Sequence, residues 1–266
     1  MSQEISTPAV AEPLVRTVVE DGIASLIMDS PKNFNALSSA MLAELQAAIE
    51  GIAADNSVRV VVMRGEGKAF SAGHDMREMR RMSRDQQAAL FEQCNRVMLS
   101  MLRMPQPVIA RVHGMATAAG CQLVANCDLA VAARSAQFAV SGVNYGIFCG
   151  TPSVPLARNL SRKFAFEMLV TGEFIDAEAA YARGLVNRVV EAEALDEEVA
   201  RLAAAIKSKP REVVAAGKDL FYRQVEMGMS AAYQLAGASM VCSLQAPAGQ
   251  EGMAAFSEKR KPVFNP

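Results

Sequence analysis

The first part of the chain combines strand-like and helix-like patterns of apolar residues. Two β-rich runs, residues 14–19 and 23–28, are separated by Asp21-Gly22, a dipeptide favoured in tight hairpin turns. Over residues 38–52 the apolar positions recur at helical spacing, and two serines at the start of this stretch can cap a helix. The sequence therefore predicts a β-hairpin followed by a helix.

Three further apolar runs predict buried strands. Residues 58–63, 108–112 and 129–132 are short and continuous, which is typical of strands that are covered on both faces. The segments between them, 86–102 and 116–126, have helical patterns. Strands that alternate with helices predict an α/β core.

The patterning changes in the second half of the chain. Over residues 161–259 strand-like runs almost vanish, and Ala-, Leu-, Met- and Glu-rich helical patterns replace them. We expect residues 1–12 to be disordered, residues 13–200 to form the core, and residues 201–266 to form a helical region. Helices rich in Met and Ala can pack on their own core or on a neighbouring subunit, and composition leaves both possibilities open.

Composition narrows the class of partner. The chain has 266 residues, 51% of them hydrophobic, which is enough for one sizeable core. Its formal net charge is −1, and the basic residues are scattered, unlike those of proteins that bind nucleic acid or membrane surfaces. No apolar run reaches the length of a membrane span, and the acidic, arginine-free start does not resemble a signal or transit peptide. We expect a small-molecule partner.

Cysteine and histidine usage argues against disulfides and metals. The five cysteines form no C-x-x-C pair, and an odd number does not suit a disulfide framework. The two histidines, His74 and His113, do not form a metal-binding pair on a helix. We therefore expect a cytoplasmic protein without a metal or a separate cofactor.

Two loops carry the pattern with the most chemical content. Residues 68–76 (KAFSAGHDM) follow a predicted strand and contain Gly73, and residues 113–123 (HGMATAAGCQL) follow the next one. Small residues at a helix start leave backbone N–H groups bare, and these groups favour an anionic oxygen. Such clusters also occur simply where elements pack closely. If the two loops face each other, they predict an oxyanion hole.

Taken in order, several segments resemble the enoyl-CoA hydratase/isomerase (crotonase) family. They are Asn35-Ala36-Leu37, AFSAGHD, PVIARVHGMATAAGCQLVANCDLAVA, LVTGEFIDAEAAYARGLVNRVV and EGMAAFSEKRKP, within residues 14–264. NFNAL, SAGHD and ATAAGCQLVA also resemble an atypical subgroup, the enoyl-CoA hydratase domain-containing proteins. The resemblance implies an α/β crotonase-like spiral of repeated ββα units. It also implies a helical C-terminal region that builds trimers, often paired into hexamers.

The resemblance assigns roles at the oxyanion hole. It implies that the backbone N–H groups of His74 and Ala119 bind a thioester carbonyl oxygen and stabilise the enolate. The imidazole of His74 then needs no acid/base role. His113 falls at a family position that is usually structural, and we expect Asp75 and Asp128 to be structural too, as caps or turn residues.

The resemblance also implies how coenzyme A is held. Backbone near Ala72 and Met76 is expected to hold the adenine. Lys32 lies in the early loop where the phosphates often pass, and Phe256 and Lys259 belong to a tail that can cover the nucleotide. The expected partner is an acyl-CoA thioester.

The sequence departs from the family at its acid/base positions. The two glutamates of family hydratases fall on Gln122 and Gly142, and a third carboxylate, used by dienoyl-CoA isomerases, falls on Asn144. A positioned acid or base typically contributes about 10²–10⁴ in rate, and none of these three residues can exchange a proton at neutral pH. We expect the ordinary hydratase mechanism to be absent, and restoring both acids to raise the hydration rate where the pocket admits a water.

Other nearby groups have simpler interpretations. Glu78 and Glu92 fit a charged helix face, whereas Cys121, Tyr145 and Cys149 fit the packing of a pocket wall, since no activating base is apparent.

Three functions remain open. The first is an enzyme that works mainly through its oxyanion hole, such as a decarboxylase of malonyl-type CoA thioesters. The second is a hydratase or isomerase with an unrecognised acid/base group. The third is a non-catalytic acyl-CoA binder.

Overall fold

The computed structural model describes residues 12–264. Strands β1 (Val15–Glu20) and β2 (Ile23–Met28) pair in antiparallel fashion. Asp21 and Gly22 between them both have positive φ angles, 48° and 74°, as a two-residue turn of this kind requires. The predicted hairpin is confirmed. The expected disorder of residues 1–12 falls, apart from Glu12, outside the described residues.

A six-stranded sheet in the order β1-β2-β3-β5-β7-β10 forms the base of the core. All neighbours in it except β1 and β2 run parallel. The strands that follow the hairpin are β3 (Val60–Gly65), β5 (Val108–Val112), β7 (Leu129–Ala133) and β10 (Arg188–Val190). The first three correspond to the predicted apolar runs. The sequence does not predict β10, because this strand has three residues within a mainly helical stretch.

A second sheet in the order β4-β6-β8-β9 consists of short strands that the sequence does not predict. They are β4 (Ala69–Ser71), β6 (Met115–Thr117), β8 (Gln137–Ala139) and β9 (Ile175–Asp176). Two or three residues are too few to show alternation. The helix predicted over 116–126 consequently starts later, because residues 115–117 belong to β6.

The order of elements repeats along the core. A long parallel strand leads into a short strand of the second sheet and then into a helix, three times in succession: β3-β4-α2, β5-β6-α4 and β7-β8-α5. The helices of this part are α2 (Met76–Met79), α3 (Arg84–Arg103), α4 (Ala119–Asn126) and α5 (Gly150–Asn159). The predicted spiral of ββα units is confirmed.

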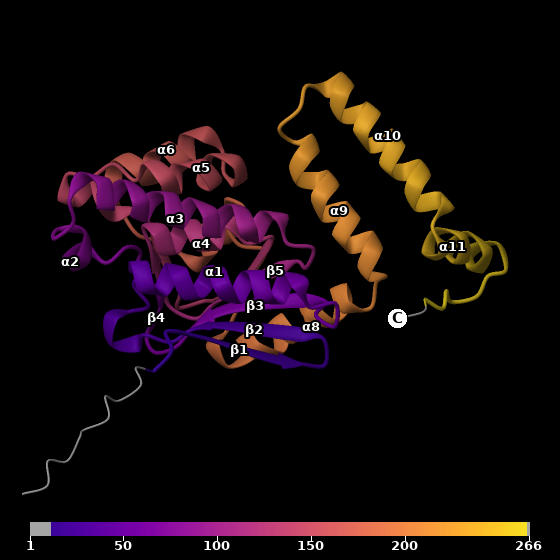
Figure 1. Cartoon of the computed structure of the whole chain (residues 1–266), viewed down its shortest axis with the longest axis horizontal. Coiled ribbons are helices and arrows are strands. Elements are labelled where there is room, and N and C mark those ends of the chain that lie inside the picture. The colour runs from indigo at the N-terminus through magenta and orange to yellow at the C-terminus, as the bar shows by residue number, and fades with distance from the viewer. Residues whose placement is uncertain (1–11, 265–266) are drawn as a thin grey trace, which may run out of the picture.

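Both faces of the larger sheet are buried, as the continuous apolar runs predict. Along β3, Val61 and Met63 point into the main core under α1 (Ser39–Ala54), whereas Val60 and Val62 pack toward α8 (Leu195–Lys207) on the other face. Figure 1 shows α1 and α8 on opposite sides of the strands. The remaining helices of the core are α6 (Arg162–Thr171), α7 (Ala177–Ala182) and three short 3₁₀ segments, Pro31–Asn33, Ser141–Tyr145 and Ala192–Ala194.

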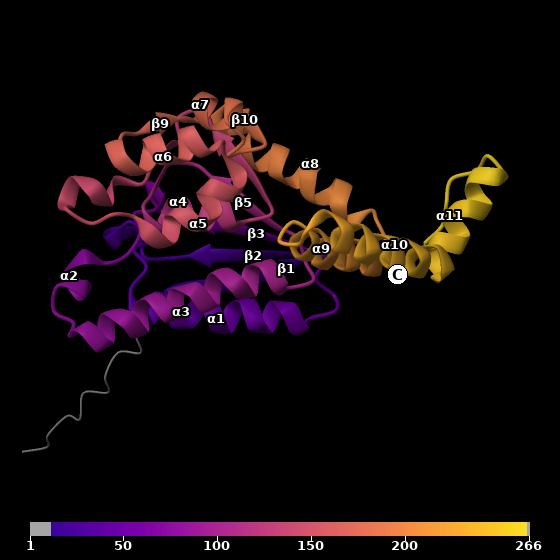
Figure 2. The same ribbon diagram turned by 90° about the horizontal axis from the view of Figure 1, so that it is seen from above.

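The last three helices, α9 (Arg211–Gln224), α10 (Met229–Gln245) and α11 (Pro247–Ser257), form a C-terminal arm. Both ribbon views show the arm projecting from the core (Figures 1 and 2). Helix α10 has no buried residue within the described chain, although it is strongly apolar. The predicted domain division at residue 200, which falls within α8, stays a prediction.

One lysine anchors the arm to the core. The buried Nζ of Lys218, on α9, donates to Asp128 Oδ2 at 2.6 Å and to the carbonyl oxygens of Met101 and Gln106 at 2.8 and 2.9 Å. Asp128 also accepts the N–H of Val108 at 2.7 Å, so it joins α9 to the start of β5. Asp128 therefore has a structural role, as expected, but as the partner of a buried lysine and not as a cap or turn residue.

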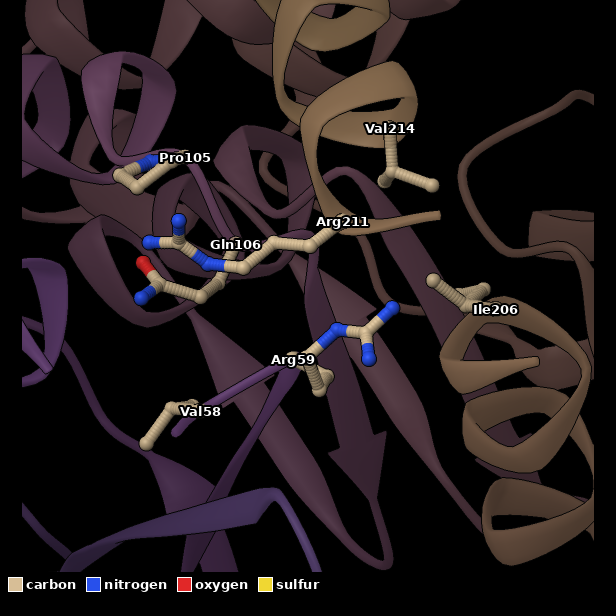
Figure 3. Close-up of a pocket in the computed structure, with 7 residues that line it drawn as sticks. All are labelled: Val58, Arg59, Pro105, Gln106, Ile206, Arg211 and Val214. Atoms are coloured by element: carbon tan, nitrogen blue, oxygen red, sulfur yellow. The ribbon is translucent and has the colours of Figure 1, made fainter. Parts of the chain in front are cut away.

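A small cavity of about 10 Å³ lies beside this anchor, at the junction of core and arm. Figure 3 shows the side chain of Arg211 extending from α9 toward Gln106, with Arg59 and Ile206 nearby. The Nε2 atom of Gln106 donates to the carbonyl oxygen of Ile52 at 2.9 Å. The junction therefore combines apolar contacts with buried polar ones, and its cavity is far too small for a substrate.

Candidate functional site

The two glycine-containing loops meet at one edge of the second sheet. Strands β4 and β6 pair in parallel, so the loops that leave their carboxyl ends lie side by side. Gly73 has a φ of 85°, and a Cβ there would lie 2.9 Å from the amide nitrogen of Ala119. A Cβ at Gly120 would lie only 2.2 Å from the carbonyl oxygen of Ser71. Glycine at both positions lets the loops approach, as the sequence suggests.

The backbone around the two amides is held in place on both sides. Ala118 has a φ of 49° and a ψ of −119°, an uncommon conformation for alanine, and its N–H donates to the carbonyl oxygen of Ala139 at 2.9 Å. The N–H of Leu37 donates to the carbonyl oxygen of Gly73 at 2.8 Å. Among the hydrogen bonds of residues 12–264, none uses the amide N–H of His74 or of Ala119. Neither donor is therefore used by a partner within the described chain.

These loops open onto a cavity of about 440 Å³, a size suited to a small-molecule ligand. Its wall is mostly apolar. The lining residues are Ala72, His74, Met76, Met79, Phe91, Ala118, Ala119, Ser141, Gly142, Tyr145, Ile147, Phe148, Cys149, Gly150, Thr151 and Pro152. None of them is an aspartate or a glutamate.

The imidazole of His74 is fixed against the cavity wall. Its Nδ1 lies 3.1 Å from the carbonyl oxygen of Leu37, so Nδ1 carries the proton and donates. The ring packs edge-on against Phe91, with 5.2 Å between ring centres. Burial lowers the pKa of His74, which favours the neutral imidazole. Within the described chain, Nε2 is buried without a hydrogen-bond partner.

The three positions of the family's carboxylates differ in their surroundings. Gln122 is 3% exposed, lies on α4, and is not part of the cavity wall. Gly142 lines the cavity, but a Cβ there would lie 2.5 Å from the carbonyl oxygen of Ile147 and 2.7 Å from the sulfur of Cys149. Asn144 is exposed, and its Nδ2 donates to the carbonyl oxygen of Gly172 at 3.3 Å, outside the cavity.

The space at Gly142 changes one expectation. Restoring both glutamates cannot simply rebuild the family's acid/base pair, because the backbone of Ile147 occupies the place of the new side chain. In this conformation the site excludes the second glutamate by shape.

The residues expected to hold coenzyme A lie in different places. Ala72 and Met76 line the cavity. Lys32 is exposed in the short 3₁₀ segment after β2 and is not part of the wall. Phe256 and Lys259 lie at the end of the C-terminal arm, where Phe256 is 87% exposed. Within a single chain the structure does not bring the arm residues to the loops (Figure 2).

Two other carboxylates are engaged outside the cavity. The carboxylate of Glu78 accepts the N–H of Ser39 at 3.0 Å, and that of Glu92 lies 3.5 Å from Arg96 on an exposed helix face. Asp75 caps α2 by accepting the N–H of Arg77 at 2.8 Å, which confirms its structural role.

The five cysteines are all free. Tyr145 and Cys149 line the cavity, whereas Cys121 is fully buried, and its burial raises the pKa of its thiol to about 12. Burial also raises the pKa of Cys149. A raised pKa keeps these thiols protonated at neutral pH, so neither is an activated nucleophile.

Several wall residues are not identifiable from the sequence. Phe91 comes from the middle of α3, and Ile147 and Phe148 come from the irregular segment before α5. Their exposed fractions, 43% for Ile147 and 52% for Phe148, are high for apolar side chains. An apolar cluster between two predicted elements is the one signal that points to them.

The repeated ββα spiral, with the two loops of His74 and Ala119 lining one mostly apolar cavity, defines a protein of the crotonase class. The chain belongs to the enoyl-CoA hydratase/isomerase family, whose model matches residues 19–266. It is similar to human enoyl-CoA hydratase domain-containing protein 3, mitochondrial, with 47% identity over 92% of this chain and 81% of the human protein. The corresponding rat protein is 46% identical over 95% of this chain and 84% of its own length.

Solved structures agree with this assignment. An enoyl-CoA hydratase from Mycobacterium smegmatis is 55% identical, with a TM-score of 0.93 over 95% of this chain and 99% of that one. The human domain-containing protein 3 superposes with a TM-score of 0.91 at 46% identity, over 94% of this chain and 100% of that one. The predicted family and fold are confirmed.

Compartment and metal content stay predictions. The vertebrate relatives carry the word mitochondrial in their names, so similarity does not support the expected cytoplasmic location. No helix among residues 12–264 is both long and apolar enough to cross a membrane. In the same part of the chain, no three His, Cys, Asp or Glu side chains are grouped to hold a metal ion.

Proposed function

We propose that this chain binds acyl-CoA thioesters, places the carbonyl oxygen between the N–H groups of His74 and Ala119, and stabilises the thioester enolate. The observation that carries the proposal is the close contact of the two loops, with both residues lining one cavity and neither amide N–H in a hydrogen bond within the described chain. An oxyanion-hole donor of this kind is typically worth about 3 kcal/mol of transition-state stabilisation.

The reaction that suits this cavity best needs an enolate but no carboxylate. Decarboxylation of a malonyl-type thioester meets that condition. The bond between the α-carbon and the carboxyl group breaks and carbon dioxide leaves. The electron pair of the broken bond stays on the α-carbon and forms the enolate, which then takes a proton from water. A wall without aspartate or glutamate favours this reaction over hydration, because a leaving carboxylate is less stable in apolar surroundings.

A ligand pair tests the oxyanion hole directly. Crotonyl-CoA and the thioether analogue that lacks its carbonyl oxygen differ only at the proposed contact. We expect the thioester to bind more tightly by isothermal titration calorimetry. Equal affinities would contradict the proposed contact. His74→Ala is the matched control, since it keeps the backbone N–H and therefore binds the thioester almost normally.

A mass-spectrometric screen of CoA thioesters then separates the three functions. Loss of carbon dioxide from a malonyl-type thioester supports the decarboxylase, and gain of water by an enoyl thioester supports a hydratase. An isomerase leaves the mass unchanged and is recognised by a shift in chromatographic retention, whereas binding with neither change supports the non-catalytic binder.

We also propose that the chain assembles as a trimer or a hexamer through its C-terminal arm. The support is the apolar surface of α10, where Met229, Tyr233 and Met240 are 75%, 73% and 60% exposed. A neighbouring subunit would cover these side chains, and could bring the tail residues Phe256 and Lys259 to a nucleotide.

A further inference from the structure

A second concavity adjoins the cavity of about 440 Å³ that His74 and Ala119 line, which we call the acyl cavity. The second concavity is lined by arginines, whereas the acyl cavity is mostly apolar. This arginine groove, of about 640 Å³, is lined by Met76, Arg77, Met79, Arg80, Arg81, Gln87 and Ile147. Three of the seven residues, Met76, Met79 and Ile147, also line the acyl cavity. These three apolar side chains therefore form a common border between the two spaces.

The three guanidinium groups of the groove are not neutralised locally. Within residues 12–264, none of them forms an ion pair, whereas Arg96 further along α3 pairs with Glu92. Of the acids nearest in sequence, Asp75 caps α2, Glu78 accepts the N–H of Ser39, and Asp85, in the first turn of α3, forms no ion pair with these arginines. The whole chain has a formal net charge of −1, so the positive charge of the groove is a local feature.

The groove is also remote from the C-terminal arm. Helix α2, which carries these arginines or leads into them, lies at the opposite end of the core from α10 and α11 in both views (Figures 1 and 2). Phe256 and Lys259, the tail residues expected at the nucleotide, therefore lie far from it within one chain.

We infer that Arg77, Arg80 and Arg81 recognise a carboxylate at the far end of the acyl chain, so that the preferred ligands are CoA thioesters of dicarboxylic acids. This inference rests on the proposed acyl-CoA site. The methylene chain would lie along the side chains of Met76, Met79 and Ile147, which leaves the backbone near Ala72 and Met76 to the adenine, and the terminal carboxylate would meet the guanidinium groups. Guanidinium and carboxylate match in charge and geometry, since two parallel N–H donors face two oxygens.

Matched thioesters test the inference. Dissociation constants are measured for adipoyl-CoA and hexanoyl-CoA, which share a six-carbon chain, and for the ten-carbon pair sebacoyl-CoA and decanoyl-CoA. We expect the wild-type chain to prefer the dicarboxylic member of at least one pair by about tenfold, as expected for hydrogen bonds to a charged group. In Arg80→Gln/Arg81→Gln this preference should disappear while the affinity for hexanoyl-CoA stays the same. Arg84→Gln/Arg103→Gln, which also removes two positive charges but at exposed positions of α3 outside the groove wall, should retain the preference.

Several outcomes would overturn the inference, and they can be told apart from failure of the proposed function. If hexanoyl-CoA binds but neither pair shows a preference, only the carboxylate contact is wrong. If the double variant weakens adipoyl-CoA, hexanoyl-CoA and free CoA equally, the arginines bind the nucleotide phosphates instead. Pantetheine thioesters, which lack those phosphates, distinguish the two contacts. If the arginines bind the acyl carboxylate, adipoyl-pantetheine should still bind more tightly than hexanoyl-pantetheine. If no thioester binds, the proposed function itself fails.

Discussion

Adding a side chain at Gly142 is the perturbation that most directly tests the shape of the site. A Cβ at this position would lie 2.5 Å from the carbonyl oxygen of Ile147, nearly an ångström inside ordinary van der Waals contact, and 2.7 Å from Cys149 Sγ. A backbone carbonyl cannot move aside as a flexible side-chain end can. We expect Gly142→Ala to lower the free energy of unfolding by about 1–3 kcal/mol, the usual cost of overpacking.

Gly150 supplies the matched control, because it lines the same cavity, has no positive φ, and would have no other atom within 4 Å of an added Cβ. Gly150→Ala should be neutral, or more stable by about 0.4–1 kcal/mol, because alanine restricts the unfolded chain. Urea unfolding followed by circular dichroism measures both variants. Equal stability of Gly142→Ala and wild type would refute the steric argument.

The same contact determines what the restored acids can do. Gln122→Glu with Gly142→Glu is expected to yield little hydration of crotonyl-CoA, because the second carboxylate reaches the cavity only if residues 147–149 move. If the double variant gains hydratase activity without losing stability, residues 147–149 move aside at no cost, which would contradict the steric argument.

Three further predictions concern the anchor, His74 and the arm. Lys218→Met leaves Asp128 without its buried partner and should lower the free energy of unfolding, measured in urea, by about 3 kcal/mol. The control Arg223→Met removes the exposed pair with Asp219 and should cost less than about 1 kcal/mol. Similar losses in the two variants would contradict the role of Lys218 as an anchor. Because burial lowers the pKa of His74 below 6.5, the unfolded state binds more protons just below that pH, and stability is lost as pH falls through this window. His74→Ala should reduce this loss of stability with falling pH, and the remaining loss would come from His113, whose pKa is also lowered by burial. An unchanged pH dependence of stability would contradict a lowered pKa of His74. Light scattering at micromolar concentration should give a trimer or hexamer, and a monomer would contradict the proposed role of the arm.

Much of the fold can be predicted from the sequence, because the long elements follow simple periodic rules. The hairpin at Asp21-Gly22, the helix capped by Ser38 and the strand β5 lie within a residue or two of their predicted bounds. The hairpin is marked by a dipeptide that strongly favours a two-residue turn, and the helix and the strand by apolar patterns longer than one helical turn.

The rest depends on contacts between segments far apart in the chain. The short strands β4 and β6 exist because they pair with each other, and neither has a pattern of its own. The distance from Gly142 to the carbonyl oxygen of Ile147 is likewise invisible in the residue types alone. A missing glutamate can be seen in the sequence, but whether its space still exists cannot.

The chemistry of the candidate site divides in the same way. The resemblance identifies both loops, and the structure brings Gly73 and Ala119 together. It does not bring Phe256 to the cavity within one chain, because the arm projects from the core. The arginine groove also becomes visible only in the folded chain, since basic residues in and just after a short helix usually indicate no more than a solvated face.

The rate at which the wild-type protein hydrates crotonyl-CoA tests the central claim most directly. Adding water to the double bond needs a base for the water and an acid for the α-carbon, and Gln122 and Gly142 provide neither. Two lost groups at about 10²–10⁴ each predict a rate at least about 10⁴-fold below that of a family hydratase that has both glutamates. The assay is loss of the enoyl absorbance at neutral pH, with binding of crotonyl-CoA confirmed by calorimetry on the same sample. Tight binding with almost no loss of absorbance is the predicted result, and turnover at ordinary hydratase rates would contradict the account.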